Sequence, residues 1–105
     1  MRNYLSSDNL TFQYDYSNEL KAKIRKLKKK SRKRANIIKT KTIEIINSDE
    51  ETINRYKNLR YDLKDEKRVH INGSFVLTFK FIKEKQFILF TDFDHHDKIY
   101  QRKKK

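Results

Sequence analysis

Six of the seven phenylalanines of this 105-residue chain lie between residues 75 and 93. From Phe75 to Phe81 every second residue is large and apolar, which is the pattern of a strand that buries one face. The polar residues 83–85 predict a turn, and residues 86–93 then form a last strand. These phenylalanines must therefore supply the contribution of a β-sheet to the core.

The segment before these strands alternates as well, and it ends in a turn. Residues 68–71 alternate polar and apolar side chains, and Asn72 and Gly73 follow as a pair typical of tight hairpins. Gly73 is the only glycine of the chain. The C-terminal half therefore predicts three antiparallel strands, after which a polar stretch can open a short helix.

The N-terminal half begins with one strand pattern and continues with two helical ones. Residues 10–16 alternate apolar and polar side chains, which predicts a strand. Ser17 or Asn18 can cap a helix that breaks near residues 30–31, and a second helix then runs to about residues 47–48. The apolar positions that define the two helices are Leu20, Ile24 and Leu27 in the first and Ala35, Ile38, Thr42, Ile45 and Ile46 in the second.

The order of these segments predicts an α+β fold: N-terminal strand, helical hairpin, three-stranded antiparallel sheet and short C-terminal helix. The acidic residues 49–51 suit the first turn of a short third helix that includes Ile53. We expect a single domain over residues 1–105, with residues 1–9 and 102–105 flexible. No apolar run reaches the length of a membrane span and the first residues lack a secretory signal, so we expect a cytoplasmic protein.

The charge balance indicates the partner. The chain has 27 Lys and Arg against 14 Asp and Glu, which gives a formal net charge of +13. Such an excess favours a polyanion, with nucleic acid ahead of a membrane surface, because counterion release alone supports binding without sequence preference. The absence of cysteine excludes a disulfide framework, thiolate catalysis and cysteine-ligated zinc.

Much of this charge lies in one segment. Ten of the fourteen residues from Lys21 to Arg34 are Lys or Arg. A solvated helix face is the plain interpretation, but the net charge favours contact with a phosphate backbone, for which Lys28, Lys29 and Arg32 are the predicted residues. Docking of an acidic protein partner is the alternative.

The three histidines all lie in the last 36 residues. Histidine, with an unperturbed pKa of roughly 6.5, can give and take protons near neutrality. In the strand pattern, His70 shares a face with Arg68, where a base and a guanidinium could address one phosphate group. The alternative is a strand histidine satisfied by a neighbour.

A second histidine site follows the last predicted strand. His95 and His96 are flanked by Asp94 and Asp97, and three interpretations stay open: a metal site, an acid or base tuned by a carboxylate, or ordinary polarity at a helix start. Metal is the weakest, since no histidine spacing matches a zinc signature. Tyr100, four residues after His96, could pack or contact RNA. No glycine-rich phosphate loop is present.

Four stretches together resemble the RelE/ParE superfamily of type II toxins, and within it the archaeal RelE-like and YafQ-related mRNA interferases. They are LRYDLK at 59–64, RVHI at 68–71, SFVLTF at 74–79 and DFDHHDKIY at 92–100. The resemblance covers most of residues 10–102. It implies a ribosome-dependent messenger-RNA endoribonuclease that uses neither metal nor cofactor and is held inactive by an acidic, RelB-like antitoxin.

The resemblance also implies the chemistry. In such enzymes the 2′-hydroxyl of one nucleotide attacks its own 3′-phosphate, which leaves a 2′,3′-cyclic phosphate and a free 5′-hydroxyl. By position in the family motifs, His70 is the expected base, His96 the general acid, Arg68 the phosphate stabiliser and Tyr100 the aromatic that contacts substrate. The further RNA-binding residues expected are His95, Lys64 and Lys80.

The chain departs from the family pattern at two positions. The strand arginine that stabilises the transition state falls near Val76 here, and an aspartate of the YafQ-related toxins falls near Ser74. Arg68 or a flanking lysine would have to replace the arginine. Two alternatives remain: an inhibitor of DNA gyrase like the ParE branch, and a non-catalytic basic protein that binds ribosomal RNA.

Overall fold

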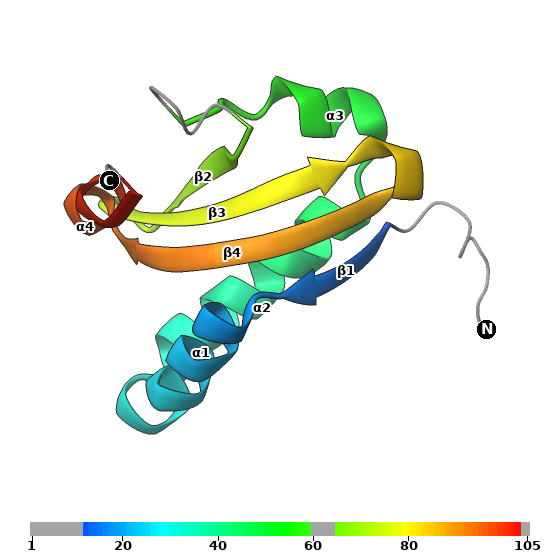
Figure 1. The fold of residues 1–105 in the computed structure, drawn as a ribbon. Coiled ribbons are helices and arrows are strands. Elements are labelled where there is room, and N and C mark those ends of the chain that lie inside the picture. Colours follow the sequence, from blue (N-terminus) through cyan, green and yellow to red (C-terminus); the bar gives the residue numbers. More distant parts are fainter. Residues whose placement is uncertain (1–11, 60–64, 104–105) are drawn as a thin grey trace, which may run out of the picture.

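The computed structural model describes residues 12–59 and 65–103, the last four of these by their backbone. It confirms the α+β fold and shows one sheet with helices beside it (Figure 1). In chain order the elements are β1 (Gln13–Tyr16), α1 (Asn18–Lys30), α2 (Arg32–Ile46), α3 (Glu50–Arg55), β2 (Lys67–Ile71), β3 (Phe75–Ile82), a 3-10 turn (Lys83–Lys85), β4 (Phe87–His95) and α4 (His96–Lys103).

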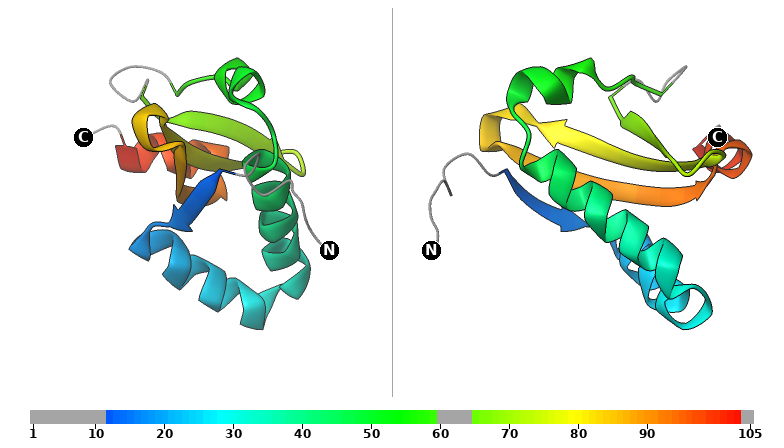
Figure 2. Two further views of the ribbon diagram at one scale, coloured as in Figure 1. Left: turned by 90° about the vertical axis from the view of Figure 1, so that its right-hand side faces the viewer. Right: turned by 180° about the vertical axis from the view of Figure 1, so that it is seen from behind.

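The sheet has four strands in the order β1-β4-β3-β2. The hairpins β2–β3 and β3–β4 are antiparallel, as the sequence predicts, whereas β1 pairs with β4 in parallel. Helices α1 and α2 form a hairpin against one face of the sheet, and α4 lies at the end where β4 finishes (Figure 2). Of the predicted N-terminal strand, residues 10 and 11 lie outside the described residues.

Serine residues set the limits of the helical hairpin. The Ser17 side chain accepts from the N–H of Leu20 and caps α1. Ser31 ends α1 and at the same time caps α2 by accepting from the N–H of Arg34, so a single residue joins the two helices. Asn47 ends α2 with a φ of −95°, which is outside the left-handed region.

The core has one large and one small cluster, on opposite faces of the sheet. Alternate residues of β3 and β4, among them Phe79 and Phe90 with no exposure, pack with α1, α2 and α3 in the large cluster. Complete burial of one such side chain contributes about 1.5–3 kcal/mol to the free energy of unfolding. The small cluster joins Leu59, Val76 and Ile99, which brings α4 against the opposite face.

Two backbone irregularities shape the site end of the sheet. Asn72 and Gly73 have φ values of 55° and 87°, the left-handed pair that a tight hairpin turn requires. Between Thr78 and Phe79 the register with β4 shifts by one residue, so that Thr91 is an extra residue in β4. After this β-bulge, Phe93 lies on the same face as Phe90.

The free edge of β4 is covered by α1. Strand β1 pairs only with Phe87 to Phe90, and beyond that point Ser17 donates from its N–H to the carbonyl of Phe90 and from its hydroxyl to the carbonyl of Thr91. Helix α1 therefore begins beside the second half of β4 and points its C-terminal half past the sheet (Figure 1). No helix in the described part of the chain is both long and apolar enough to cross a membrane.

Candidate active site

Two histidines from distant parts of the chain lie side by side at one end of the sheet. His70 is an exposed residue of β2, and His96 is the first residue of α4. Their ring centroids are 6.2 Å apart and the ring planes differ by 21°. The N–H of His96 donates to the carbonyl of Ser74 at 2.8 Å, which holds the start of α4 against the β2–β3 hairpin. The structure thus brings the two predicted proton-transfer residues together.

The histidine pair lies on the face opposite the large core cluster. Val69 and Ile71 pack with that cluster, so Arg68 and His70 point to the other face of β2, as the alternation predicts. His70 is in register with Val76, which belongs to the small cluster beside α4. The side chain next to His70 on this face is therefore a buried valine.

Arg68 is half-buried two residues before His70. Its Nε–H is buried and has no hydrogen-bond partner among the described residues. A buried donor without an acceptor costs about 1–3 kcal/mol, and such groups are rare in folded proteins. Arg68 thus places a cation with a buried, unused donor on the same face of β2 as His70.

A buried polar layer lies on the same face. Glu66 is 4% exposed and accepts a hydrogen bond from the Thr91 hydroxyl at 2.5 Å, while the hydroxyls of Thr91 and Thr78 are 2.6 Å apart. Thr78 is in register with Arg68. The start of β2 is therefore tied to β4 across β3, which fixes the strand that carries Arg68 and His70.

His96 has a carboxylate partner within its own helix. Its Nδ1 lies 3.3 Å from Oδ1 of Asp97. A carboxylate can only accept a hydrogen bond, so this contact requires the proton on Nδ1 and orients the ring. The ring is about one-third exposed, with a side-chain accessibility of 36%. Three interpretations were open for the neighbours His95 and His96. The geometry of His96 fits one of them, an acid or base oriented by a carboxylate.

His95 occupies a different environment from its neighbour. Its Nδ1 accepts from the N–H of Asp97 at 3.2 Å, which is a capping interaction at the start of α4. Its ring meets the ring of Phe75 edge-on, with 5.9 Å between centroids, on the face of the large core cluster. The described residues contain no group of three or more His, Cys, Asp or Glu placed to hold a metal ion.

The other predicted site residues are scattered. Lys80 lies on β3 four residues beyond Val76, about 13 Å along the strand, and its ammonium is 3.8 Å from the exposed carboxylate of Asp65. Tyr100 is in α4, one turn after His96, but its side chain is outside the described residues. Lys64 lies outside them altogether. The structure thus leaves Lys80 away from the histidine pair.

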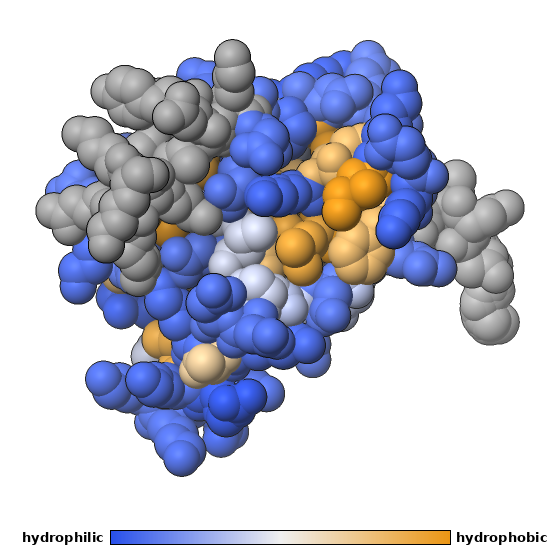
Figure 3. All heavy atoms as spheres, viewed as in Figure 1, coloured by the Kyte–Doolittle hydropathy of each residue, from blue (hydrophilic) through white to orange (hydrophobic). Residues whose placement is uncertain are grey.

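The predicted basic residues Lys28, Lys29 and Arg32 lie at the tip of the helical hairpin. The first two end α1, Arg32 begins α2, and all three are exposed. The tip extends beyond the sheet, and its surface is mostly hydrophilic (Figure 3). Apolar side chains gather instead over the end of β3 and β4 where the chain turns between them. The hairpin tip therefore offers charge at a distance from the histidine pair.

Three side chains that support the sheet have shifted pKa values. Burial lowers the pKa of Lys67, whose ammonium donates to the carbonyl of Tyr56 and the side chain of Asn58. Burial raises the pKa of the Tyr56 phenol, which packs on Phe79 in the core. Burial also raises the pKa of Tyr16, although a hydrogen bond from its hydroxyl to Thr42 acts in the opposite direction.

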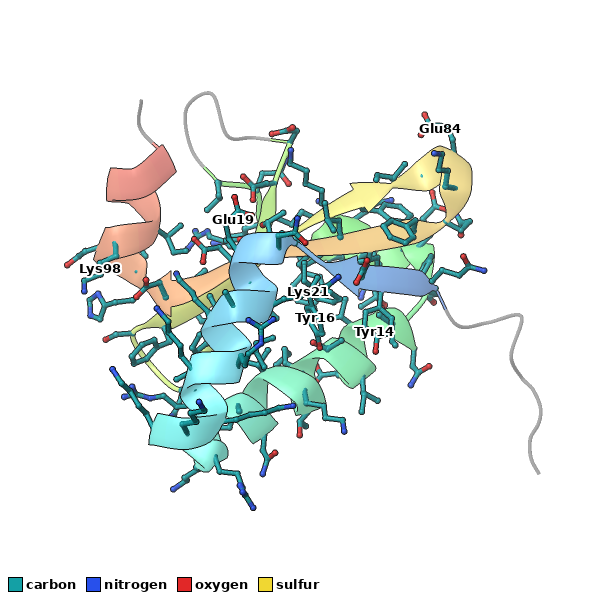
Figure 4. The ribbon with its side chains drawn as sticks, turned by 60° about the horizontal axis from the view of Figure 1, so that its bottom comes forward. Tyr14, Tyr16, Glu19, Lys21, Glu84 and Lys98 are labelled. Atoms are coloured by element: carbon teal, nitrogen blue, oxygen red, sulfur yellow. The ribbon has the colours of Figure 1, made fainter. Side chains whose placement is uncertain are left out.

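The position of Tyr16 ties the edge strand to a helix. Figure 4 shows Tyr14 and Tyr16 on the side of β1 that faces α2. The hydroxyl of Tyr16 is 3.0 Å from Oγ1 of Thr42, a fully buried residue of α2. This contact secures β1, which is far from the histidine pair, and gives these tyrosines a structural role.

One ion-pair cluster of the site end was not predicted. The ammonium of Lys23 in α1 lies 2.7 Å from Asp92 and 2.9 Å from Asp94, and it also donates to the carbonyl of Phe93. This cluster fastens the basic helix to β4 just before the two histidines. Asp92 and Asp94 alternate with Phe93 in the sequence, but nothing in the sequence alone assigns them to Lys23.

No family model matches the chain. A protein of Methanocaldococcus jannaschii that carries the toxin name RelE4 is 44% identical over 81 residues, which cover 77% of this chain and 82% of that protein. The RelBE2 toxin–antitoxin complex of Mycobacterium tuberculosis contains a chain with a TM-score of 0.66 and 13% identity, at coverages of 82% and 92%. YafQ of E. coli has a TM-score of 0.65 and 19% identity, at coverages of 85% and 98%.

Proposed function

This chain belongs to the RelE family of toxins of toxin–antitoxin systems, and we propose that it is a metal-independent endoribonuclease that cleaves messenger RNA in the ribosomal A site. The observation that carries the proposal is the pairing of His70 and His96. The ring centroids are only 6.2 Å apart, and each ring can form a hydrogen bond of about 2.8 Å to a phosphate oxygen. One phosphodiester can therefore contact both rings.

The reaction needs two proton transfers. His70 takes the proton of the ribose 2′-hydroxyl, whose oxygen forms a bond to the adjacent phosphorus and closes a 2′,3′-cyclic phosphate. The bond from phosphorus to the 5′-oxygen of the next nucleotide breaks, and His96 protonates that oxygen. Asp97 supports this role because its carboxylate holds the proton on Nδ1 and so orients the ring.

Charge builds on the phosphoryl oxygens during the reaction. Arg68 is the proposed cation for this charge, because Val76 and Ser74 replace the arginine and aspartate of other family members. Val76 is buried in the small cluster, and Ser74 uses its carbonyl to hold His96. Tyr100 is proposed to stack on a substrate base, and Lys64, Lys80, His95, Lys28, Lys29 and Arg32 are proposed to contact RNA or the ribosome.

The excess of positive charge also supports two partners. The ribosomal A site presents RNA phosphates, which a net charge of +13 attracts. An acidic antitoxin would neutralise the same surface, and a relative by fold is known in a toxin–antitoxin complex. We therefore propose a RelB-like acidic antitoxin as the cognate inhibitor and the cytoplasm as the site of action.

Cleavage in a reconstituted translation system tests the function. The wild-type chain should cut messenger RNA only on ribosomes and leave 2′,3′-cyclic phosphate and 5′-hydroxyl ends, while His70→Ala should lose about 100-fold in rate. Lys98→Ala on the exposed side of α4 is the matched control (Figure 4). If messenger RNA stays uncut and the chain inhibits DNA supercoiling by gyrase, the chain is a gyrase inhibitor. If variants without the histidines still arrest growth, the chain is a non-catalytic RNA-binding protein.

A further inference from the structure

A cleft of about 290 Å³ opens on the other face of the same sheet end. Its walls are the helical hairpin on one side and the ends of β3 and β4 on the other. Lys26 and Lys30 of α1 and Arg34 of α2 line the hairpin side, and Phe75 and Phe93 line the sheet side. The cleft therefore combines cations with aromatic rings, and the carboxylate of Asp94, which pairs with Lys23, also lines it.

The aromatic side of the cleft is arranged in layers. The rings of Phe75 and Phe93 are stacked, with centroids 5.4 Å apart and an angle of 12° between planes. The guanidinium carbon of Arg34 lies 4.3 Å from the centroid of the Phe75 ring, and His95 meets that ring edge-on. Phe75 is half-buried by these contacts, whereas Arg34 is exposed and also lines the cleft. Nucleic-acid bases stack on both kinds of flat surface, aromatic rings and guanidinium planes.

The cations of the cleft differ in their partners. Lys23 at the inner end is held by Asp92 and Asp94, which fixes α1 against β4. Lys26, Lys30 and Arg34, in contrast, have no ion pair with a carboxylate among the residues that the structure describes. Three such charges around one opening match the phosphates of an RNA chain.

The cleft lies next to the proposed cleavage site. Phe75 is in register with His95, whose neighbour His96 forms the histidine pair. Ser74, the residue before Phe75, accepts the hydrogen bond that holds His96. A nucleotide in the cleft and a phosphate at the histidine pair would thus lie on either side of one short piece of backbone.

We propose that this cleft binds one unpaired nucleotide of single-stranded RNA adjacent to the cleaved bond. The base stacks against the layer formed by Arg34 and Phe75, and its flanking phosphates pair with Lys26 and Lys30. This inference rests on the proposed function for its position relative to cleavage. An acidic peptide would use the three cations but would leave the aromatic layer without a partner, which is why RNA fits better.

Binding of fluorescein-labelled hexauridylate and hexaadenylate to the full chain, followed by anisotropy without ribosomes, tests the inference. Phe75→Leu keeps an apolar side chain but removes the ring, so it should weaken binding about tenfold. Phe87→Leu, which changes a half-buried phenylalanine at the far end of β4, should change binding less than about twofold. Arg34→Lys keeps the positive charge but removes the planar guanidinium group on which a base can stack, so it should weaken RNA binding about threefold.

An affinity of folded Phe75→Leu equal to that of the wild type overturns the inference. If Phe75→Leu does not fold, Arg34→Lys decides in the same way. Displacement of RNA by polyglutamate, together with unchanged affinity of both variants, would identify a dock for an acidic protein and also overturn it. A wild-type chain that binds through Phe75 but does not cut messenger RNA would refute the proposed function and leave the nucleotide site standing.

Discussion

The two faces of the sheet end where β4 meets α4 carry different kinds of groups. On one face, His70 and His96 stack next to Arg68, and the floor is a buried valine. On the other face, lysines and Arg34 surround stacked phenylalanines, and the one histidine there caps a helix. The difference teaches that one strand end can carry both proposed roles, proton transfer and RNA binding, because alternate residues are directed to opposite faces.

The largest expected effect is a difference between neighbouring histidines. His96→Asn should lose about 100-fold in messenger cleavage because it removes the proposed general acid. His95→Asn should lower the cleavage rate less than about fivefold, because asparagine also caps helices well and the His95 ring makes only an edge contact with Phe75. Rates on isolated ribosomes measure both. Equal losses would show that the two faces do not divide the work in this way.

The second effect concerns the link between the two faces. Lys23→Met leaves Asp92 and Asp94 without their shared cation, and because Asp92 is 8% exposed the free energy of unfolding should fall by about 2 kcal/mol. The matched control is Lys41→Met, which removes a pair with the exposed carboxylate of Glu44 and should cost about 0.5 kcal/mol or less. Urea unfolding measures both values. A similar small loss in both variants would mean that α1 is not fastened to β4 by this cluster.

The smallest effect is a change in salt dependence. Lys26→Gln combined with Lys30→Gln removes two proposed phosphate contacts, so the slope of log affinity against log salt for hexauridylate should become shallower by about 1.4. His70→Asn should leave that slope as it is, because the ring makes no proposed charge contact in the ground state. Anisotropy titrations at several salt concentrations give the slopes. Equal slopes in all three proteins would place the phosphates elsewhere.

Local patterns were sufficient to predict the elements and one part of the site. The alternation of residues 68–71 placed Arg68 and His70 on one face, and the Asn72-Gly73 turn formed as predicted. These features depend on residues that are near in sequence, so period and turn chemistry decide them. The RelE-like order of strand, hairpin and sheet was predicted for the same reason.

Long-range packing was not predictable. The contact of Arg34 with Phe75 and the cluster of Lys23 with Asp92 join residues far apart in sequence, and the parallel pairing of β1 with β4 does the same. The last strand was predicted to end at residue 93, whereas it continues to His95. That extension places His95 beside Phe75 rather than in the helix with His96, a distinction that the sequence pattern could not make.

The extra residue in β4 has a consequence for how such sites can change. Side chains alternate between faces, so the single insertion at Thr91 reverses the assignment of every later residue in the strand. Without it, Phe93 and His95 would exchange faces with Asp92 and Asp94, and the carboxylates would meet the core. A one-residue insertion or deletion in this strand acts on faces as a frameshift acts on codons: it reassigns all downstream positions at once, with no side chain substituted.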